Sequence, residues 1–98
     1  FFNNLIEEDP NFAEAWNKRA TVYFMMGDFD KSMQDIIKTL ELEPRHFGAL
    51  DGMGLIFIHQ GQYQQAIDVY DKMLEIFPFS LKTMEKRENI MSFISQST

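Results

Sequence analysis

The 98-residue sequence has no cysteine. A disulfide framework, a thiolate metal site and a cysteine nucleophile are therefore excluded, while the absence fits any cellular compartment. No apolar run approaches the roughly 18 residues that a membrane-spanning helix needs, so we expect no membrane insertion. Acidic residues outnumber basic residues by 15 to 9, and no basic patch with interleaved aromatic residues is present. This balance argues against a nucleic-acid partner.

The rest of the composition is that of an ordinary globular domain. Hydrophobic residues make up 45% of the chain and charged residues 24%, which predicts a soluble protein. The length supports one domain spanning residues 1–98. The chain begins at Phe1, without an initiator Met and already inside an apolar pattern. We therefore expect a piece of a longer protein, and we assign neither a compartment nor an export signal.

The prolines are few, and their spacing is the most informative feature of the sequence. Pro10, Pro44 and Pro78 are 34 residues apart, and the two intervals between them share one apolar pattern. A proline cannot continue a helix, because its ring fixes φ and removes the N–H group. The sequence therefore predicts a repeat protein with two full units, each of which ends at a proline.

Each unit is predicted to hold two helices. Trp16, Ala20 and Tyr23 recur at i, i+4 and i+7, the spacing of one face of an amphipathic helix, and the later segments repeat this periodicity. A glycine breaks the pattern in the middle of each unit, as expected for a turn between helices. The expected helices span 13–26, 29–42, 47–60 and 63–76, with breaks at Gly27 and Gly61.

The two ends of the chain are predicted to differ from the full units. Residues 1–9 read as the tail of the second helix of a preceding repeat, whose first helix is missing. After Pro78 the chain is again helical in period, but Arg87 and Glu88 stand where a repeat would place apolar or small residues. Because the last helix of a solenoid turns a polar face to water, we expect residues 81–95 to form a capping helix.

The stretches 13–44 and 47–78 resemble the tetratricopeptide repeat (TPR), with repeats expected at 13–46 and 47–80. The segment from Trp16 to Ile56 looks like repeat proteins of bacterial type. The resemblance implies an all-α solenoid of antiparallel helix pairs, coiled as a right-handed superhelix. The residues on the family's signature positions are Trp16, Ala20, Tyr23, Gly27, Ser32 and Pro44 in the first copy and Leu50, Gly54, Phe57, Gly61, Ala66, Tyr70 and Pro78 in the second.

Close packing of the two helices in a hairpin explains both the small and the large residues at the signature positions. Ala20 and Gly54 are expected to be small because the two helices of one hairpin approach closely there, while aromatic residues fill the adjacent space. Three residues depart from the family pattern: Arg19, Thr39 and Met73. We expect Arg19 to lay its stem along apolar surface with its guanidinium group in water, and Met73 to fill an irregular gap.

No motif in the sequence indicates catalysis, a cofactor or a metal. The glycines of 48–54 do not form a phosphate-binding loop, because they lie inside a predicted helix and no Lys-Ser or Lys-Thr pair follows. His46 and His59 have no metal-ligating partner at i+3 or i+4, and we expect His59 to interact with the carbonyl groups at its helix C-terminus. The sequence therefore predicts a protein that is not an enzyme.

The resemblance implies that the concave face, lined by the first helix of each repeat, binds a ligand. A chaperone-tail clamp is disfavoured, because such a clamp needs several converging donors and Gly52 offers no side-chain donor. Phe24, Leu55 and Ile58 also fit a second interpretation, as core residues between adjacent helices, and for Phe24 the two are equal. The groove positions are Asn17, Lys18, Thr21, Phe24, Met25, Asp51, Gly52, Leu55, Ile58, His59, Lys82, Lys86 and Asn89.

Two functions follow from this interpretation. The first is a non-enzymatic protein-protein interaction module that binds a peptide or a helix of a partner in its concave groove. The alternative is structural self-association as a homodimer, because Phe1, Phe2, Leu5 and Ile6 form an apolar edge on a helix that lacks its partner. The sequence does not identify the ligand or the number of repeats in the full-length protein.

Overall fold

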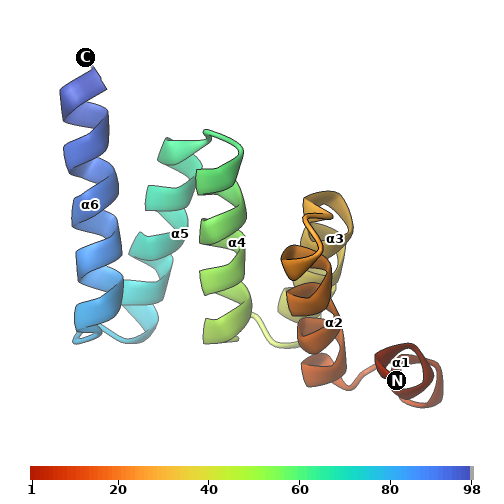
Figure 1. Ribbon diagram of the computed structural model, residues 1–98. Coiled ribbons are helices and arrows are strands. Elements are labelled where there is room, and N and C mark those ends of the chain that lie inside the picture. The colour runs from red at the N-terminus through yellow and green to blue at the C-terminus, as the bar shows by residue number, and fades with distance from the viewer. Residues whose placement is uncertain (98) are drawn as a thin grey trace.

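The computed structural model describes residues 1–97, and every regular element in this range is an α-helix (Figure 1). The helices form an elongated row of 48 × 28 × 17 Å, with the two termini at opposite ends. Their bounds are α1 Phe2–Glu8, α2 Ala13–Met25, α3 Phe29–Leu42, α4 Phe47–His59, α5 Tyr63–Ile76 and α6 Leu81–Ser97.

The row is built from hairpins of neighbouring helices. α2 packs on α3 and α4 packs on α5, and in Figure 1 α2 and α4 lie nearer to the viewer than α3 and α5. The hairpins are joined through contacts of α3 with α4 and of α2 with α4, while α1 covers α2 and α6 covers α5. The predicted all-α solenoid of antiparallel helix pairs is confirmed. The predicted helix ends differ from the observed ones by at most two residues, because helix ends are the least determined by apolar periodicity.

The turns follow local sequence signals. Gly27 and Gly61, between the helices of each hairpin, have φ values of +80° and +73°, a left-handed conformation that L side chains rarely adopt. Asp28 caps the N-terminus of α3, because its carboxylate accepts a hydrogen bond from the backbone N–H of Lys31. His46 caps the N-terminus of α4 in the same way, because its Nδ1 accepts a hydrogen bond from the backbone N–H of Ala49 at 3.0 Å.

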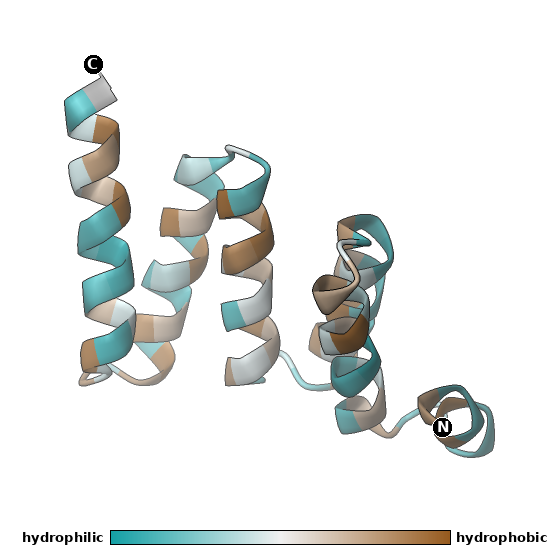
Figure 2. Ribbon diagram, viewed as in Figure 1, coloured by the Kyte–Doolittle hydropathy of each residue, from teal (hydrophilic) through white to brown (hydrophobic). Residues whose placement is uncertain are grey.

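The core runs along the row in two clusters that meet where α3 packs on α4. α4 is strongly hydrophobic, whereas α6 carries long hydrophilic stretches (Figure 2). α4 therefore supplies residues to both clusters, and Leu40 of α3 and Met53 of α4 pack against both. The first cluster consists of Ala20, Ile36, Ala49 and Ile56, and the second of Leu50, Ala66, Ile67, Val69, Tyr70, Met73 and Ile90.

The small residues of the repeat lie where the helices approach most closely, as predicted. The Ser32 hydroxyl, on α3, donates to the carbonyl oxygen of Ala20 on α2 at 2.7 Å. A Cβ atom at Gly54 would lie only 2.8 Å from Cε1 of the fully buried Tyr70 ring. Met73 is also fully buried in the second cluster, which agrees with its expected role in filling the core.

Tyr70 predicts a fall of stability in alkaline solution. Burial raises the pKa of its phenol to about 12, and the charge of Asp51 adds to the shift. The unfolded chain loses this proton near pH 10. Because the folded pKa is the higher one, this contribution to stability is fully present below pH 10 and is lost as the pH rises toward 12. We expect the thermal midpoint to fall more steeply over this range in the natural chain than in the Tyr70→Phe variant. An equal fall in both proteins would contradict the assignment.

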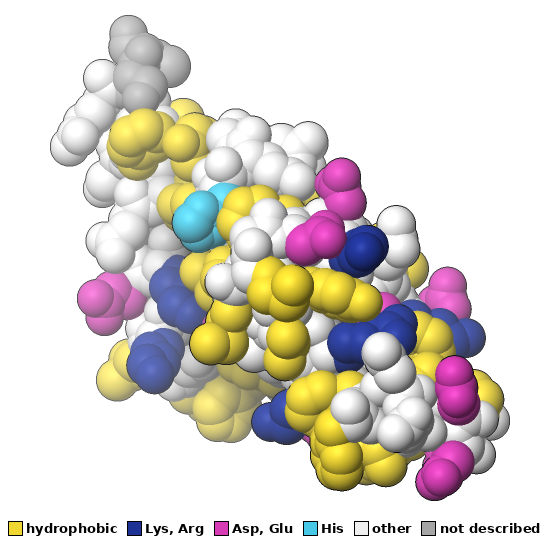
Figure 3. Space-filling model, turned by 45° about the vertical axis from the view of Figure 1, so that its right-hand side comes forward, with side chains coloured by type: hydrophobic (Ala, Val, Ile, Leu, Met, Phe, Trp, Pro, Cys, Tyr) yellow, Lys and Arg dark blue, Asp and Glu magenta, His cyan; other side chains and the backbone are white. Residues whose placement is uncertain are grey.

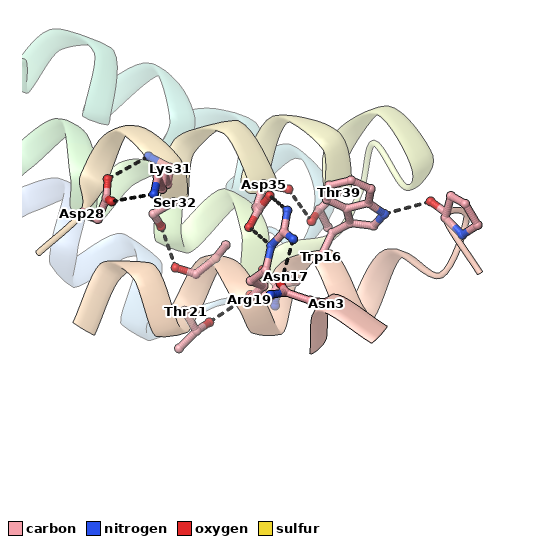
Figure 4. A network of polar contacts seen from close by, with 12 residues as sticks. Asn3, Trp16, Asn17, Arg19, Thr21, Asp28, Lys31, Ser32, Asp35 and Thr39 are labelled. Carbon is pink, nitrogen blue, oxygen red and sulfur yellow. Dashed lines mark hydrogen bonds and ion pairs between the residues drawn. The ribbon is translucent and has the colours of Figure 1, made fainter. Parts of the chain in front are cut away.

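Arg19 is the main correction to the sequence interpretation of the core. Its guanidinium group does not lie in water but forms a two-point ion pair with Asp35 of α3, at 2.8 Å for each bond (Figure 4). A third bond, of 3.0 Å, reaches Asn3 of α1. The Asp35 side chain is only 4% exposed, and the guanidinium group also lies 5.2 Å from the centre of the Trp16 ring. Arg19 therefore ties α1, α2 and α3 together.

Candidate functional site

A pocket of about 170 Å³ lies between α2 and α4, the first helices of the two hairpins. Its walls come from successive turns of both helices, and two residues of α3 form its floor. Most of the lining is apolar, with three polar side chains on the wall. The lining residues are Asn17, Ala20, Thr21, Phe24, Ser32, Ile36, Gly48, Asp51, Gly52 and Leu55.

The structure brings six of the sequence-predicted groove positions together in this pocket: Asn17, Thr21, Phe24, Asp51, Gly52 and Leu55. It adds four residues that the sequence placed elsewhere. Ala20, Ser32 and Gly48 were interpreted as helix-packing positions, and Ile36 as part of an amphipathic helix. The i, i+4 spacing of Gly48 and Gly52 is the sequence signal that identifies this wall, because residues four apart share one helix face.

Lys86 extends the pocket wall toward the last helix. Its ammonium group, on α6, donates to the Asp51 carboxylate of α4 at 2.7 Å. Both side chains are about one-third exposed, so the pair lies at the surface and not in the core. α2, α4 and α6 are therefore connected along one face of the row, by the pocket on one side of α4 and by this ion pair on the other.

The remaining predicted groove positions do not line the pocket. Lys18 and Lys82 are exposed, and Met25 is 79% exposed at the end of α2. Asn89, also named from the family register, is exposed on α6. Ile58 packs against the core cluster around Tyr70, which agrees with the core interpretation given for it above.

His59 lies in the last turn of α4, where the sequence placed it, and it also packs against aromatic residues. Its ring lies 5.5 Å from the ring of Phe24 and 5.1 Å from that of Phe29, measured between centroids. The sequence did not predict these aromatic contacts. Phe24 lines the pocket and also packs against the first core cluster.

A polar network fixes the pocket at the N-terminal ends of α2 and α4. Because Nδ1 of His46 accepts the Ala49 N–H, its Nε2 carries the proton and lies 3.3 Å from the Glu14 carboxylate. Asn17 donates to the same carboxylate at 3.3 Å. Partial burial acts to raise the pKa of Glu14, but the hydrogen bonds from Asn17 and His46 and nearby positive charge lower it on balance. The network therefore orients Asn17 at the pocket wall.

The described residues offer no arrangement for metal chemistry. Among residues 1–97, no three His, Asp or Glu side chains gather closely enough to hold a metal ion. Within the same residues, none of the helices combines the length and apolar character needed to cross a membrane. Asp51 is the one charged residue in the pocket lining, and Lys86 already pairs with it.

The repeated hairpins and the pocket between their first helices define a helical-repeat protein. Residues 1–34 and 47–80 match models of the tetratricopeptide repeat family, and these segments make up more than half of the chain. The chain therefore belongs to the tetratricopeptide repeat family.

The curated relatives are similar over most of this chain. A TPR repeat-containing protein of Rhizobium etli is 40% identical over 92 residues, which cover 94% of this chain and 45% of that protein. The small glutamine-rich tetratricopeptide repeat-containing protein 2 of Mycosarcoma maydis is 26% identical over 77 residues, 79% of this chain and 22% of that protein. The first relative confirms the resemblance to bacterial TPR proteins. The chain spans less than half the length of either relative.

Two solved structures share the fold. The first TPR of Spaghetti (RPAP3), bound to the HSP90 peptide SRMEEVD, superposes with a TM-score of 0.88 at 18% identity, covering 96% of this chain and 75% of that one. YrrB, a TPR protein with an unusual peptide-binding site, has a TM-score of 0.88 at 20% identity, covering 97% of this chain and 49% of that one. At 18% and 20% sequence identity, the structural similarity shows only that the chains share a fold.

Proposed function

We propose that this chain is a non-enzymatic protein-interaction module that binds an extended peptide or a helix of a partner on the face formed by α2, α4 and α6. The observation that carries the proposal is the pocket between α2 and α4, whose lining is mostly apolar with polar side chains among it. Recognition sites for peptides commonly combine an apolar centre with polar groups around it. The repeats at 13–46 and 47–80 and the capping helix at 81–95 are part of the same proposal.

The surface and the related structures support this function. On the face shown in Figure 3, hydrophobic side chains gather in the middle, with Lys and Arg side chains on either side. The first TPR of Spaghetti holds an HSP90 peptide, and YrrB is described as having a peptide-binding site. We extend peptide binding to this chain because its fold and family are the same. We do not extend the HSP90 peptide itself, since among the described residues Lys86 is the only Lys or Arg that forms an ion pair with a pocket-lining residue, and it is already paired.

Two arginines placed in the groove should abolish peptide binding. The test uses peptides selected on the chain from a display library of random 12-residue sequences. We expect the Asn17→Arg, Asp51→Arg variant to lose at least tenfold in affinity, measured by fluorescence anisotropy, because both positions lie on the pocket wall. The thermal midpoint should change little, since the Asp51–Lys86 pair is partly exposed and such pairs contribute at most about 1 kcal/mol.

The matched control places the same charges outside the groove. Gln34 on α3 and Asp68 on α5 are exposed, so a Gln34→Arg, Asp68→Arg variant changes the net charge by the same amount. It should keep the affinity of the natural chain. Equal loss in both double variants would indicate a general charge effect, and equal retention in both would contradict the proposed face.

Self-association as a homodimer remains the alternative prediction. Its apolar edge is smaller in the structure than the sequence suggested, because Ile6 is buried and α1 packs on α2. Phe1 stays 87% exposed. Sedimentation at two concentrations distinguishes the two functions, since a chain that stays monomeric at the higher concentration does not use this edge.

A further inference from the structure

We propose that the pocket between α2 and α4 receives one phenyl ring, the side chain of a phenylalanine in the bound peptide. This inference rests on the proposed function and names the residue type that the same face selects. It is carried by the size of the pocket, by the chemistry of its walls and by the two glycines that open it.

The size of the pocket fits a single aromatic ring. Its volume is about 170 Å³. Engineered apolar cavities of about 150 Å³, lined by Leu, Ile and Phe, bind benzene. The pocket here has the same kind of lining in Phe24, Ile36 and Leu55, and it is open to the surface. A phenyl group therefore fills it, whereas an alanine methyl group leaves most of it empty.

The walls of the pocket carry no uncompensated charge. Its one carboxylate, on Asp51, is neutralised by Lys86 at 2.7 Å. The Thr21 hydroxyl donates to the carbonyl of Asn17, and the Ser32 hydroxyl donates to that of Ala20. Since the two hydroxyls of the lining donate within the protein and its one carboxylate is paired, the complementary occupant is an uncharged apolar side chain and not a carboxylate or an ammonium group.

Gly48 and Gly52 create the opening, and packing explains neither of them fully. They lie four residues apart on the α4 wall, and glycine inside a helix weakens it relative to alanine. A Cβ atom at Gly52 would meet only the flexible end of Ile36, at 3.3 Å, and one at Gly48 would meet the side chains of His46 and Asn17 at 3.3 and 3.6 Å. An alanine is therefore tolerable at Gly52, whereas at Gly48 it would press on the His46 ring, which hydrogen bonds hold in place. At either position the methyl group would occupy space that the glycine leaves to a ligand.

The test uses N-acetyl-phenylalanine amide as the probe, with N-acetyl-alanine amide and N-acetyl-leucine amide as comparisons. Binding is followed by the methyl NMR signals of Ile36 and Leu55, on the floor and wall of the pocket. We expect the phenylalanine amide to shift both residues in a saturable way and the leucine amide to bind at least threefold more weakly. The alanine amide should cause no shift at these residues.

Two pocket-filling variants complete the experiment. Gly52→Ala and Gly48→Ala should each weaken the phenylalanine amide at least fivefold, and the thermal midpoint of Gly52→Ala should equal or exceed that of the natural chain. A Gln65→Ala variant, which raises helix propensity on the exposed face of α5, should bind the probe unchanged. Unchanged binding by both glycine variants, equal binding of the alanine amide, or tighter binding of the leucine amide would overturn the inference.

Failure of the phenyl-pocket inference can be distinguished from failure of the proposed function. If library-selected peptides lose affinity in the Asn17→Arg, Asp51→Arg variant but keep it in both glycine variants, the face is correct and the phenyl pocket is wrong. If the selected peptides keep their affinity in all of these variants, the proposed function fails as well.

Discussion

Replacing Gly54 with alanine is expected to lower the free energy of unfolding by up to about 2 kcal/mol, since overpacking a closely packed core usually costs about 1–3 kcal/mol before the gain in helix propensity is subtracted. The added Cβ would lie 2.8, 3.0 and 3.1 Å from Cε1, Cζ and the hydroxyl oxygen of Tyr70. This ring is fully buried, so it cannot move away without disturbing the second core cluster. The higher helix propensity of alanine offsets only about 1 kcal/mol of this cost.

The matched control is the same substitution two residues earlier on the same helix. At Gly52 the new methyl group meets only the end of the Ile36 side chain, at 3.3 Å, so we expect stability to be unchanged or raised by up to about 1 kcal/mol. Urea denaturation of both variants measures the difference. Two equally stable variants would show that α4 and α5 do not approach as closely at Gly54 as described here.

The second large effect is expected at the Arg19–Asp35 pair. Replacing Arg19 with leucine, the usual family residue, should cost about 3 kcal/mol, because it leaves the Asp35 carboxylate buried without its partner. Replacing both residues with leucine should recover most of this loss. Asp35 is at the centre of the network, since it accepts both bonds from Arg19, and its backbone carbonyl accepts the Thr39 hydroxyl (Figure 4).

A double-mutant cycle in urea measures this coupling, with an exposed ion pair as its control. Removing Glu41, which pairs with Lys38 on the surface of α3, should change stability by no more than about 0.5 kcal/mol. If Arg19→Leu costs no more than this control, the buried pair does not hold α2 and α3 together.

Most of the fold could be predicted because it depends on periodicity. The proline spacing set the length of each unit, and the one-face spacing of Trp16, Ala20 and Tyr23 marked the helices. Gly27 and Gly61 marked the turns, where the structure has positive φ values. These signals are local, so they do not require knowledge of which helices pack together.

The pairs that form across helices could not be predicted in the same way. Arg19 and Asp35 are 16 residues apart, and nothing in their sequence surroundings indicates that they meet. A family departure at Arg19 was therefore interpreted as a solvated side chain, although the departure is compensated by Asp35 on the facing helix. The aromatic contacts of His59 were missed for the same reason, because its partners Phe24 and Phe29 come from the preceding repeat.

The candidate site was predicted only in part. Family register placed Asn17, Thr21 and Leu55 on one face, and the structure brings these residues to the pocket. The family register gives the helix face on which a residue lies but not how deeply its side chain is buried. It therefore could not distinguish a pocket-lining residue from one at an exposed helix end, such as Met25. The space between α2 and α4 depends on Gly48 and Gly52, because neither residue has a side chain that would fill it.

The most direct test of the binding face is to map a library-selected peptide on the chain by backbone amide NMR. The proposed function predicts that the shifted signals cluster on α2, α4 and α6, around Thr21, Leu55 and Lys86. Shifts that instead cluster on α3 and α5, or around Phe1 on α1, would contradict the proposed binding face.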